Sequence, residues 1–403
     1  MSTVKAQYEV YPYPARDPAD EAKRLITGSP SVLMEMDHYL WDGARDWAAG
    51  TRVLVAGGGT GDGLIQLAVM LRAAKVQHDI TYIDLSEASR AVAEARAAER
   101  GLEGITFLTG SLLDAPDLGS FDYIDCCGVL HHLPDPSAGF AALSGALAPG
   151  GGLGFMVYAP YGRAGVYPLQ AAFETLYGHL PPPEKLAAAE AVFETLPDGH
   201  MFARNTHVVD HTSGDAGFYD LLLHSTDRPY AVSELLDELK GAGLGLVDLL
   251  APSAYDPALY AVVDHGLDWM TAMSVAEQLS GSMKVHVGYA VPDARGAVSR
   301  AVARPDQVPH LDGTRNDPKL ANKLAQVIAN SGSVPIVQGE VTLKLAVPKG
   351  IARAVAGING RRSLAELQAG SGLEQGSFDT AWAALDDALC GWNKMWYSRL
   401  LRR

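Results

Sequence analysis

The chain has 403 residues and a formal net charge of −15, and 48% of its residues are hydrophobic. This length allows two or three domains with buried cores. The acidic balance argues against binding of nucleic acid over the whole protein, because affinity for phosphate depends on clustered lysines and arginines. Three cysteines without metal-ligand spacing predict no metal site. An N-terminus without the apolar core of a signal peptide favours a cytoplasmic location.

Residues 1–50 are rich in tyrosine, proline and tryptophan. From 52 to about 158, strand-like runs alternate with helical stretches, and the runs are RVLVAG, DITYIDL, ITFLTG, FDYIDCCG and GGLGFMVY. This alternation is typical of βαβ units and predicts an α/β fold with a doubly wound, mostly parallel sheet. The uncharged stretch 136–162 could suggest a membrane span, but Pro149 and the glycines after it would break such a helix. We therefore expect no membrane association.

The pattern becomes less regular after residue 160. The run at 230–250 predicts one more helix followed by a strand, and MKVHVGYAV at 283–291 predicts the final strand. We interpret the irregular stretches, about 160–227 and 251–282, as cap insertions over the ligand edge of the sheet. The expected divisions of the remaining chain are an N-terminal segment at 1–50, a sheet domain at 51–294, a linker at 295–333 and a small α+β domain at 334–403.

The first strand breaks into the glycine-rich loop VLVAGGGTGDG, residues 53–63. No register of this loop fits G-x-G-x-x-G, which dinucleotide-binding folds use, and no lysine follows as a P-loop requires. The loop instead reads G-x-G-x-G at Gly57, Gly59 and Gly61. With this spacing the chain resembles the class I S-adenosylmethionine-dependent methyltransferases, whose first motif commonly reads close to VLDIGCGTG.

Further motifs carry this resemblance through about residues 50–158. YIDLS places Asp84 at the tip of the second strand, where a carboxylate can accept hydrogen bonds from ribose hydroxyls. LTGSLLD, FDYIDCCGVLHHLPDP and LAPGGG follow in the order of the family. The resemblance implies a Rossmann-like methyltransferase that uses S-adenosyl-L-methionine. It implies cofactor contacts at Gly57, Gly58, Gly59, Gly61, Asp62, Asp84, Leu85, Ser111, Leu112, Cys127 and Gly128.

One position departs from the family pattern. The family usually has an acidic residue two positions before the first glycine, near the ammonium group of the bound amino acid, and this chain has Val55 there. Asp62, just beyond the loop, is the candidate substitute. Cys126 and Cys127 are interpreted as small packing residues beneath the cofactor, because no cationic surroundings mark a reactive thiolate.

An amine or hydroxyl acceptor must lose a proton during methyl transfer, and histidine is the natural base near neutral pH. His131 and His132 follow the fourth predicted strand, at the ligand edge. We expect one ring to face the site and the other to pack, although both could be structural. Asp215 and His211, in a patch at 210–230, are the next candidates as bases or acceptor anchors, although caps and turns explain such residues equally well.

The tyrosine-rich N-terminus resembles segments that close over the cofactor in relatives. It would then act as a lid, and Tyr8, Tyr11 and Tyr13 would line the acceptor pocket; a simple surface arm is the alternative. Other candidate substrate-binding residues are Tyr158, Tyr219 and His224.

Residues 334–403 contain nine lysines and arginines against six acidic residues, a net charge of +3. The run INGRRSLAEL within them loosely resembles winged-helix units that recognise peptides or proteins. Packing or homodimerisation is the alternative role for this domain. For the whole chain we expect a peptide or protein acceptor, with a small metabolite as the alternative and a non-catalytic cofactor-binding scaffold as a third possibility.

Overall fold

The computed structural model describes residues 3–261, 266–338 and 341–402. The chain divides into two compact units, each assembled from separated segments. The first unit comprises Met1–Val32, Gly50–Leu246 and Leu267–Gly296, and the second comprises Leu33–Ala49, Val247–Gly266 and Ala297–Arg403.

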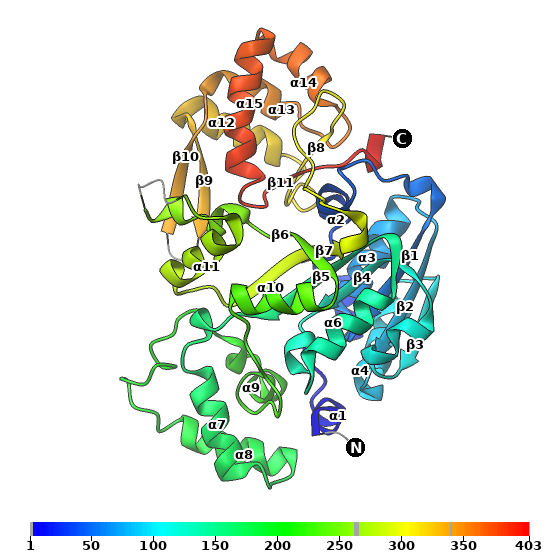
Figure 1. Ribbon diagram of the computed structural model, residues 1–403, viewed down its shortest axis with the longest axis vertical. Coiled ribbons are helices and arrows are strands. Elements are labelled where there is room, and N and C mark those ends of the chain that lie inside the picture. Colours follow the sequence, from blue (N-terminus) through cyan, green and yellow to red (C-terminus); the bar gives the residue numbers. More distant parts are fainter. Residues whose placement is uncertain (1–2, 262–265, 339–340, 403) are drawn as a thin grey trace. The chain divides into compact units, whose positions relative to one another are not determined.

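A seven-stranded sheet forms the centre of the first unit, and only its edge strand β6, Leu244–Leu249, continues past Leu246 into the second unit (Figure 1). Its strand order is β3-β2-β1-β4-β5-β7-β6, in which β1 to β5 pair in parallel and β7 pairs antiparallel to β5. This architecture confirms the predicted doubly wound, mostly parallel sheet. The strands are β1 Thr51–Ala56, β2 His78–Asp84, β3 Ile105–Thr109, β4 Phe121–Cys127, β5 Leu147–Tyr158, β6 Leu244–Leu249 and β7 Val285–Pro292.

The central strands read as continuous apolar runs because helices cover both faces of the sheet. Val53, Leu54 and Val55 of β1 are each at most 2% exposed, although they point to alternate faces. The helices of this unit are α1 Thr3–Val10, α3 Asp62–Ala73, α4 Glu87–Glu99, α5 Ala115–Leu118, α6 Pro136–Gly145, α7 Val166–Tyr177, α8 Pro182–Phe193, α9 Asp215–Leu222, α10 Val232–Gly241 and α11 Trp269–Ser280. Across the described residues, none of the helices is both long enough and apolar enough to cross a membrane.

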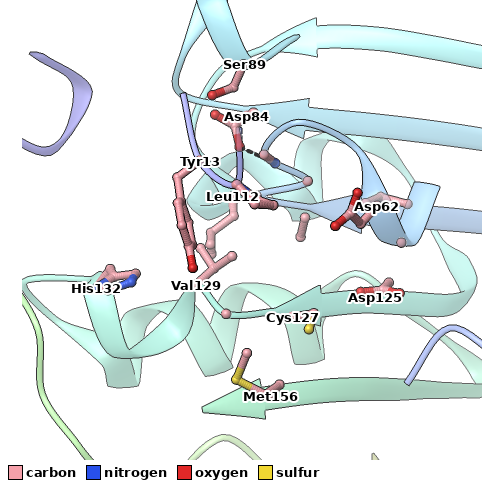
Figure 2. A pocket seen from close by; sticks show the side chains of 18 of the residues that line it. Tyr13, Asp62, Asp84, Ser89, Leu112, Asp125, Cys127, Val129, His132 and Met156 are labelled. Carbon is pink, nitrogen blue, oxygen red and sulfur yellow. Dashed lines mark hydrogen bonds between the residues drawn. The ribbon is translucent and has the colours of Figure 1, made fainter. Parts of the chain in front are cut away.

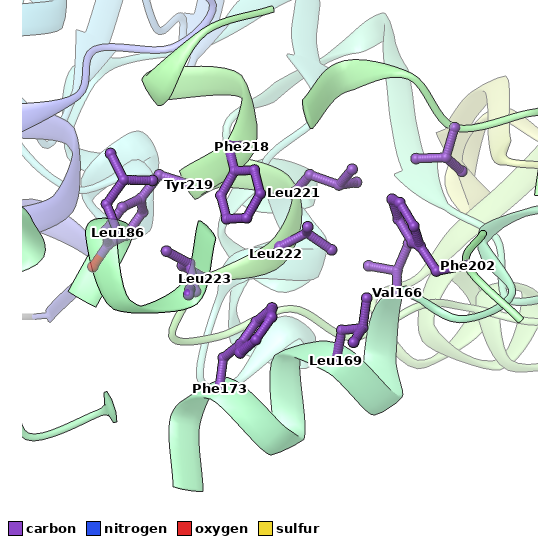
Figure 3. Close-up of a cluster of buried hydrophobic side chains, with 12 residues drawn as sticks. Val166, Leu169, Phe173, Leu186, Phe202, Phe218, Tyr219, Leu221, Leu222 and Leu223 are labelled. Atoms are coloured by element: carbon purple, nitrogen blue, oxygen red, sulfur yellow. The ribbon is translucent and has the colours of Figure 1, made fainter. Parts of the chain in front are cut away.

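The insertion at 160–227 contains α7, α8 and α9 and has a hydrophobic core of its own (Figure 3). Phe173 of α7, Leu186 of α8 and Phe218 of α9 meet in this core, and each is at most 5% exposed. The insertion is thus a small group of helices that buries its own apolar side chains, and we refer to it below as the cap. The stretch at 251–282, expected as a second insertion, is divided between the two units.

The second unit contains a short helix from the N-terminal region and most of the C-terminal part of the chain. Its elements are α2 Leu33–Leu40, β8 Pro309–Leu311, α12 Leu320–Ser331, β9 Ser333–Gln338, β10 Val341–Ala346, α13 Ala352–Ala356, α14 Leu364–Ser371, α15 Gln375–Leu389 and β11 Met395–Tyr397. A two-stranded antiparallel sheet of β9 and β10 precedes helices α13, α14 and α15. The winged-helix likeness of this unit stays a prediction.

Two of the expected divisions differ from the structure. The predicted linker at 295–333 contains β8 and the whole of α12, in which Ala321, Ala325 and Ile328 are buried. Their three- and four-residue spacing marks one apolar helix face, and the Pro-, Asp- and Gly-bearing stretch before it obscured that periodicity. The predicted N-terminal segment 1–50 is also divided, since Leu33–Ala49 belongs to the second unit.

Candidate functional site

A cavity of about 380 Å³ lies in the first unit at the carboxyl ends of the parallel strands. Its wall includes the loops after β1 and β4, the two strands at which the strand order reverses (Figure 2). Crevices at such switch points are the usual ligand sites of open α/β sheets. A cavity of this size falls within the range of pockets for small ligands and cofactors.

The glycine loop brings bare backbone to this cavity. Gly57, Gly59 and Gly61 have φ values of 68°, 51° and 98°, a conformation that other residues rarely adopt. A Cβ atom on Gly58 would lie 2.3 Å from the Tyr82 side chain, so this position requires glycine for packing. Gly57, Gly58 and Gly59 line the cavity, whereas Gly61 lies outside the lining and forms the N-cap of α3.

Asp84 ends β2 and faces the same cavity. One carboxylate oxygen accepts the Gly59 N–H at 2.8 Å, and the other accepts the Ser86 N–H at 2.8 Å. Burial raises the pKa of Asp84, while the two backbone donors oppose this shift. The aspartate therefore ties the glycine loop to β2 and retains lone pairs that face the cavity (Figure 2).

Asp62 also lines the cavity, but two arginines already hold its carboxylate. Arg16 donates through Nε and Nη2 at 3.0 and 2.6 Å, and Arg96 donates through Nη1 at 2.8 Å. Burial alone would raise the pKa of Asp62, but the two guanidinium groups outweigh it and hold the pKa below its ordinary value. Asp62 thus anchors the N-terminal segment to the start of α3.

The other predicted cofactor contacts lie around the same cavity. They are Leu85 after β2, Ser111 and Leu112 after β3, and Cys127 and Gly128 at the end of β4. Ser111 caps the short helix that begins at Leu112, which fixes the loop after β3.

The two adjacent histidines occupy different environments. His132 lines the cavity, and its Nδ1 lies 3.0 Å from the Thr226 carbonyl, which can only accept a hydrogen bond. Nδ1 therefore carries the proton in neutral His132, and Nε2 keeps its lone pair. His131 is fully buried, its Nδ1 accepts the Tyr158 N–H at 3.3 Å, and its ring stacks on Tyr158 at 3.8 Å. Burial first, then nearby positive groups, lower the pKa of His131 well below its ordinary value.

A hydrogen-bonded group of buried side chains lies beside His132. The Tyr8 hydroxyl donates to Asp220 at 2.9 Å and lies 3.2 Å from His224 Nε2. His224 Nδ1 accepts the Thr226 N–H at 3.1 Å, so Nε2 carries the proton of neutral His224 and donates to Tyr8. Burial raises the pKa values of Tyr8 and Asp220. Tyr8 and Asp220 line the cavity, whereas His224 lies behind them.

Ligand atoms of His132, Asp220 and His224 lie within 4.8 Å of one another, a set that could hold a metal ion. Sequence spacing did not predict this cluster. In the structure the Nε2 proton of His224 is directed to Tyr8 and its Nδ1 is occupied by a backbone donor. We therefore assign these side chains to a hydrogen-bond network.

Tyr13 and Tyr158 line the cavity, but four other candidates lie outside its lining. Tyr11 stacks on Tyr219 at 5.1 Å, and Tyr219 is buried in the core of the cap. His211 packs between Phe193 and Phe202, and Asp215 is exposed at the start of α9. His211 and Asp215 belong to the packing and the helix start of the cap, whereas Asp220, further along the same patch, lines the cavity.

The cavity also has polar residues that the sequence reasoning did not propose as site residues, among them Ser31, Asp125 and Asp220. Asp125 had a detectable signal, since a lone acidic residue within the apolar strand YIDCC must either face a ligand or find a buried partner. Ser31 had none, because only the tertiary fold brings it to the strand ends. Asp220 lies in the patch at 210–230, from which the sequence reasoning chose Asp215 and His211 as bases instead.

Comparison with known proteins agrees with this geometry. Residues 54–153 match the family model described as a methyltransferase domain. An uncharacterised protein of Synechococcus sp. is 34% identical over 252 residues, which cover 60% of this chain and 58% of that protein. A ubiquinone biosynthesis O-methyltransferase of Marinobacter nauticus is 33% identical over 138 residues, 34% of this chain and 53% of that protein. The chain thus spans somewhat more than half the length of these curated relatives.

Among solved structures, PKMT2 from Rickettsia typhi matches with a TM-score of 0.60 at 13% identity, covering 93% of this chain and 76% of that chain. PKMT2 in complex with AdoHcy matches with a TM-score of 0.58 at 12% identity, covering 92% and 75%. At these identities the likeness concerns the fold. The fold and the strand-end cavity define a Rossmann-like ligand-binding domain. The match over residues 54–153 agrees with the resemblance to class I S-adenosylmethionine-dependent methyltransferases that the sequence motifs carry.

Proposed function

We propose that this chain is an S-adenosylmethionine-dependent methyltransferase that acts on a peptide or protein side chain. The observation that supports methyl transfer as the activity is the cavity at the β1/β4 switch point, where the glycine loop and Asp84 meet. Bare backbone beside a carboxylate suits a nucleoside, because it offers close approach and acceptors for two ribose hydroxyls.

The residues present fit this cofactor. Asp84 would accept the ribose hydroxyls, and Leu85 and Leu112 would contact the adenosine part from the loops after β2 and β3. The N-terminus of α3, a twelve-residue helix, favours a carboxylate group nearby. When bound, the cofactor supplies an electrophilic methyl group on a sulfonium.

His132 is the side chain best placed to remove a proton from the acceptor. Its Nδ1–H is directed to the Thr226 carbonyl, so Nε2 is the basic nitrogen, and the residue lines the cavity. His131 lacks this capacity, because its Nδ1 already accepts a backbone hydrogen bond and its ring is buried. Tyr8, Tyr13 and Tyr158 would enclose the acceptor beside His132.

The nature of the acceptor rests on different observations. The helical cap at 160–227 and the separate second unit exceed what a cofactor site needs, and they favour a peptide or protein acceptor. The match to relatives named as ubiquinone biosynthesis O-methyltransferases favours a small molecule, but it covers only 34% of this chain.

Transfer of a labelled methyl group tests both parts of the proposal. The full chain is incubated with S-adenosylmethionine labelled in its methyl group and with cell extract separated by size into macromolecules and small molecules. We expect label in the macromolecular fraction, and labelling about 10²- to 10⁴-fold slower with His132→Ala. Label only in the small-molecule fraction would favour the metabolite alternative. Cofactor binding without transfer to either fraction would favour a non-catalytic scaffold.

A further inference from the structure

Asp125 is a buried carboxylate that neither the glycine motif nor the proton-transfer network uses. It lies on β4, directly beside Val55 of β1 in the parallel register, and both residues line the cavity. Val55 is the position at which the chain has an apolar residue in place of an acid. The acid is thus present at the same level of the sheet, one strand away.

The surroundings of Asp125 leave its charge without a counter-ion. The residue is 2% exposed, and the Ser31 hydroxyl donates a hydrogen bond to Oδ2. Within the described part of the chain, no lysine, arginine or histidine pairs with this carboxylate. Burial raises its pKa to about 6, with the Ser31 hydrogen bond opposing the shift. An ionised carboxylate in such a place is costly until a cation reaches it.

The backbone at the start of α3 comes close to this carboxylate. A Cβ atom on Gly63, in the first turn of α3, would lie 3.0 Å from Ser31 Oγ and 3.1 Å from Asp125 Oδ2. The start of α3 therefore approaches the Ser31–Asp125 pair closely, and its N-terminus favours a negative group. A ligand with an ammonium and a carboxylate on one carbon matches this combination of a buried acid beside a helix N-terminus.

Asp62, the neighbouring acid, could bind a cation of a ligand only by giving up hydrogen bonds to its arginine partners. Asp62 accepts hydrogen bonds from both Arg16 and Arg96, whereas Asp125 accepts from a neutral hydroxyl. Asp84 is on another wall of the cavity, at the end of β2 (Figure 2). Four aspartates line the cavity. Asp62 and Asp84 already accept hydrogen bonds from arginines or backbone N–H groups, whereas Asp125 and Asp220 are buried and each accepts from a neutral hydroxyl. Asp220 lies on α9 beside His132, so Asp125 is the one of these two that lies next to Val55 at the switch point of the sheet.

We propose that Asp125 binds the ammonium group of the amino acid part of S-adenosylmethionine and thereby selects ligands that carry it. This inference rests on the proposed function. Asp125 supplies from β4 the negative charge that Val55 does not supply from β1, and Ser31 holds the carboxylate in position. Asp84 recognises the other end of the same ligand.

Calorimetry with two ligands tests this assignment. S-adenosylmethionine carries the amino acid part, and 5′-methylthioadenosine lacks it. For Asp125→Asn we expect the affinity for S-adenosylmethionine to fall about 10- to 100-fold, the scale of a lost hydrogen bond to a charged group. The affinity for 5′-methylthioadenosine should stay within about twofold, which also shows that the variant is folded.

Asp62→Asn is the matched control, because it removes the rival carboxylate from the same cavity. The proposal is overturned if Asp125→Asn binds S-adenosylmethionine as the parent does, or if it loses both ligands equally. It is also overturned if Asp62→Asn alone shows the selective loss. A parent protein that binds neither ligand would instead contradict the proposed function.

Discussion

The cavity has two walls, one formed mainly by backbone atoms and the other mainly by side chains. The wall under the glycine loop consists largely of backbone, and its main side chain, Asp84, is held by two backbone N–H groups. The opposite wall consists of side chains from distant parts of the chain, among them Tyr8, His132 and Asp220, joined by their own hydrogen bonds. The backbone wall gives the cavity a fixed shape. The hydrogen bonds of the side-chain wall determine which of its groups carry a proton.

This difference separates two kinds of function. Cofactor recognition needs a rigid shape that many acceptors can share, and glycines with positive φ provide it. Proton transfer needs one basic nitrogen in a defined tautomer, and the Thr226 carbonyl provides it by fixing the Nδ1–H tautomer of His132. Substitutions on the two walls should therefore change different measured quantities.

The largest expected effect is on turnover and comes from the side-chain wall. His132→Ala should lower turnover about 10²- to 10⁴-fold, the usual contribution of general acid–base catalysis. Its affinity for S-adenosylmethionine should change less than about threefold, because the residue lies on the opposite wall. Steady-state kinetics with the labelled cofactor and calorimetry measure the two quantities.

His211→Ala is the matched control for this experiment. His211 packs against Phe193 and Phe202 of the cap, and it should keep near-normal turnover. Normal turnover of His132→Ala would contradict the assignment of proton transfer to the side-chain wall, because the base would then lie elsewhere or none would be needed.

Substitutions on the backbone wall should change the affinity for S-adenosylmethionine. Asp84→Ala should weaken S-adenosylmethionine binding by about 1.5–3 kcal/mol, because it removes a charged hydrogen-bond acceptor and releases the Gly59 N–H. The control is Asp79→Ala on the same strand, whose side chain is 62% exposed and which should bind normally. Equal affinities for the two variants would remove Asp84 from the cofactor site.

A stability measurement sharpens the comparison further. Burial raises the pKa of Asp125 to about 6, above the value of about 3.9 for an exposed aspartate, so the folded state binds this proton more tightly. The free energy of unfolding should therefore fall as the pH rises from about 4 to 6, and the loss remains at pH 7. Asp125→Asn should stabilise the ligand-free protein by about 1–3 kcal/mol at pH 7 and by almost nothing at pH 4.

Urea unfolding at the two pH values measures this difference. Asp117→Asn, an exposed residue of α5, removes the same charge and should leave both values unchanged. A lower stability of Asp125→Asn at pH 7 would mean that the carboxylate stabilises the ligand-free fold, contrary to its burial without a counter-ion.

The smallest effect concerns the N-terminal segment that borders both walls. Arg16→Ala removes the ion pair with Asp62 and should destabilise the protein by about 0.5–1.5 kcal/mol, since the pair is only partly exposed. Lys23→Ala breaks a pair that is 72% exposed on the lysine side and should cost almost nothing. Thermal unfolding of the two variants gives the comparison, and equal melting temperatures would contradict it.

The backbone wall could be predicted from the sequence, because a strand, a glycine loop and a helix are consecutive in the chain. Gly57 and Asp84 follow from motif spacing in a parallel sheet. Asp220 and Ser31 could not be placed, because the cap and the N-terminal segment reach the cavity only through tertiary packing. Because the sequence does not show tertiary packing, Asp215 was also predicted as a candidate base, although it is exposed on α9.

The separate core of the cap has a consequence for how such an enzyme can diversify. Val166, Phe202 and Leu222 bury one another within residues 160–227, apart from the strands that carry the glycine loop (Figure 3). Mutations in this insertion can accumulate without disturbing the sheet, because their energetic effects stay within one packed cluster. Asp220 is on α9 of that cluster and lines the cavity. Accumulated mutations in the cap should therefore change the surroundings of the acceptor before they change the cofactor site. A lineage of such chains would keep one methyl donor while exchanging the molecules it modifies.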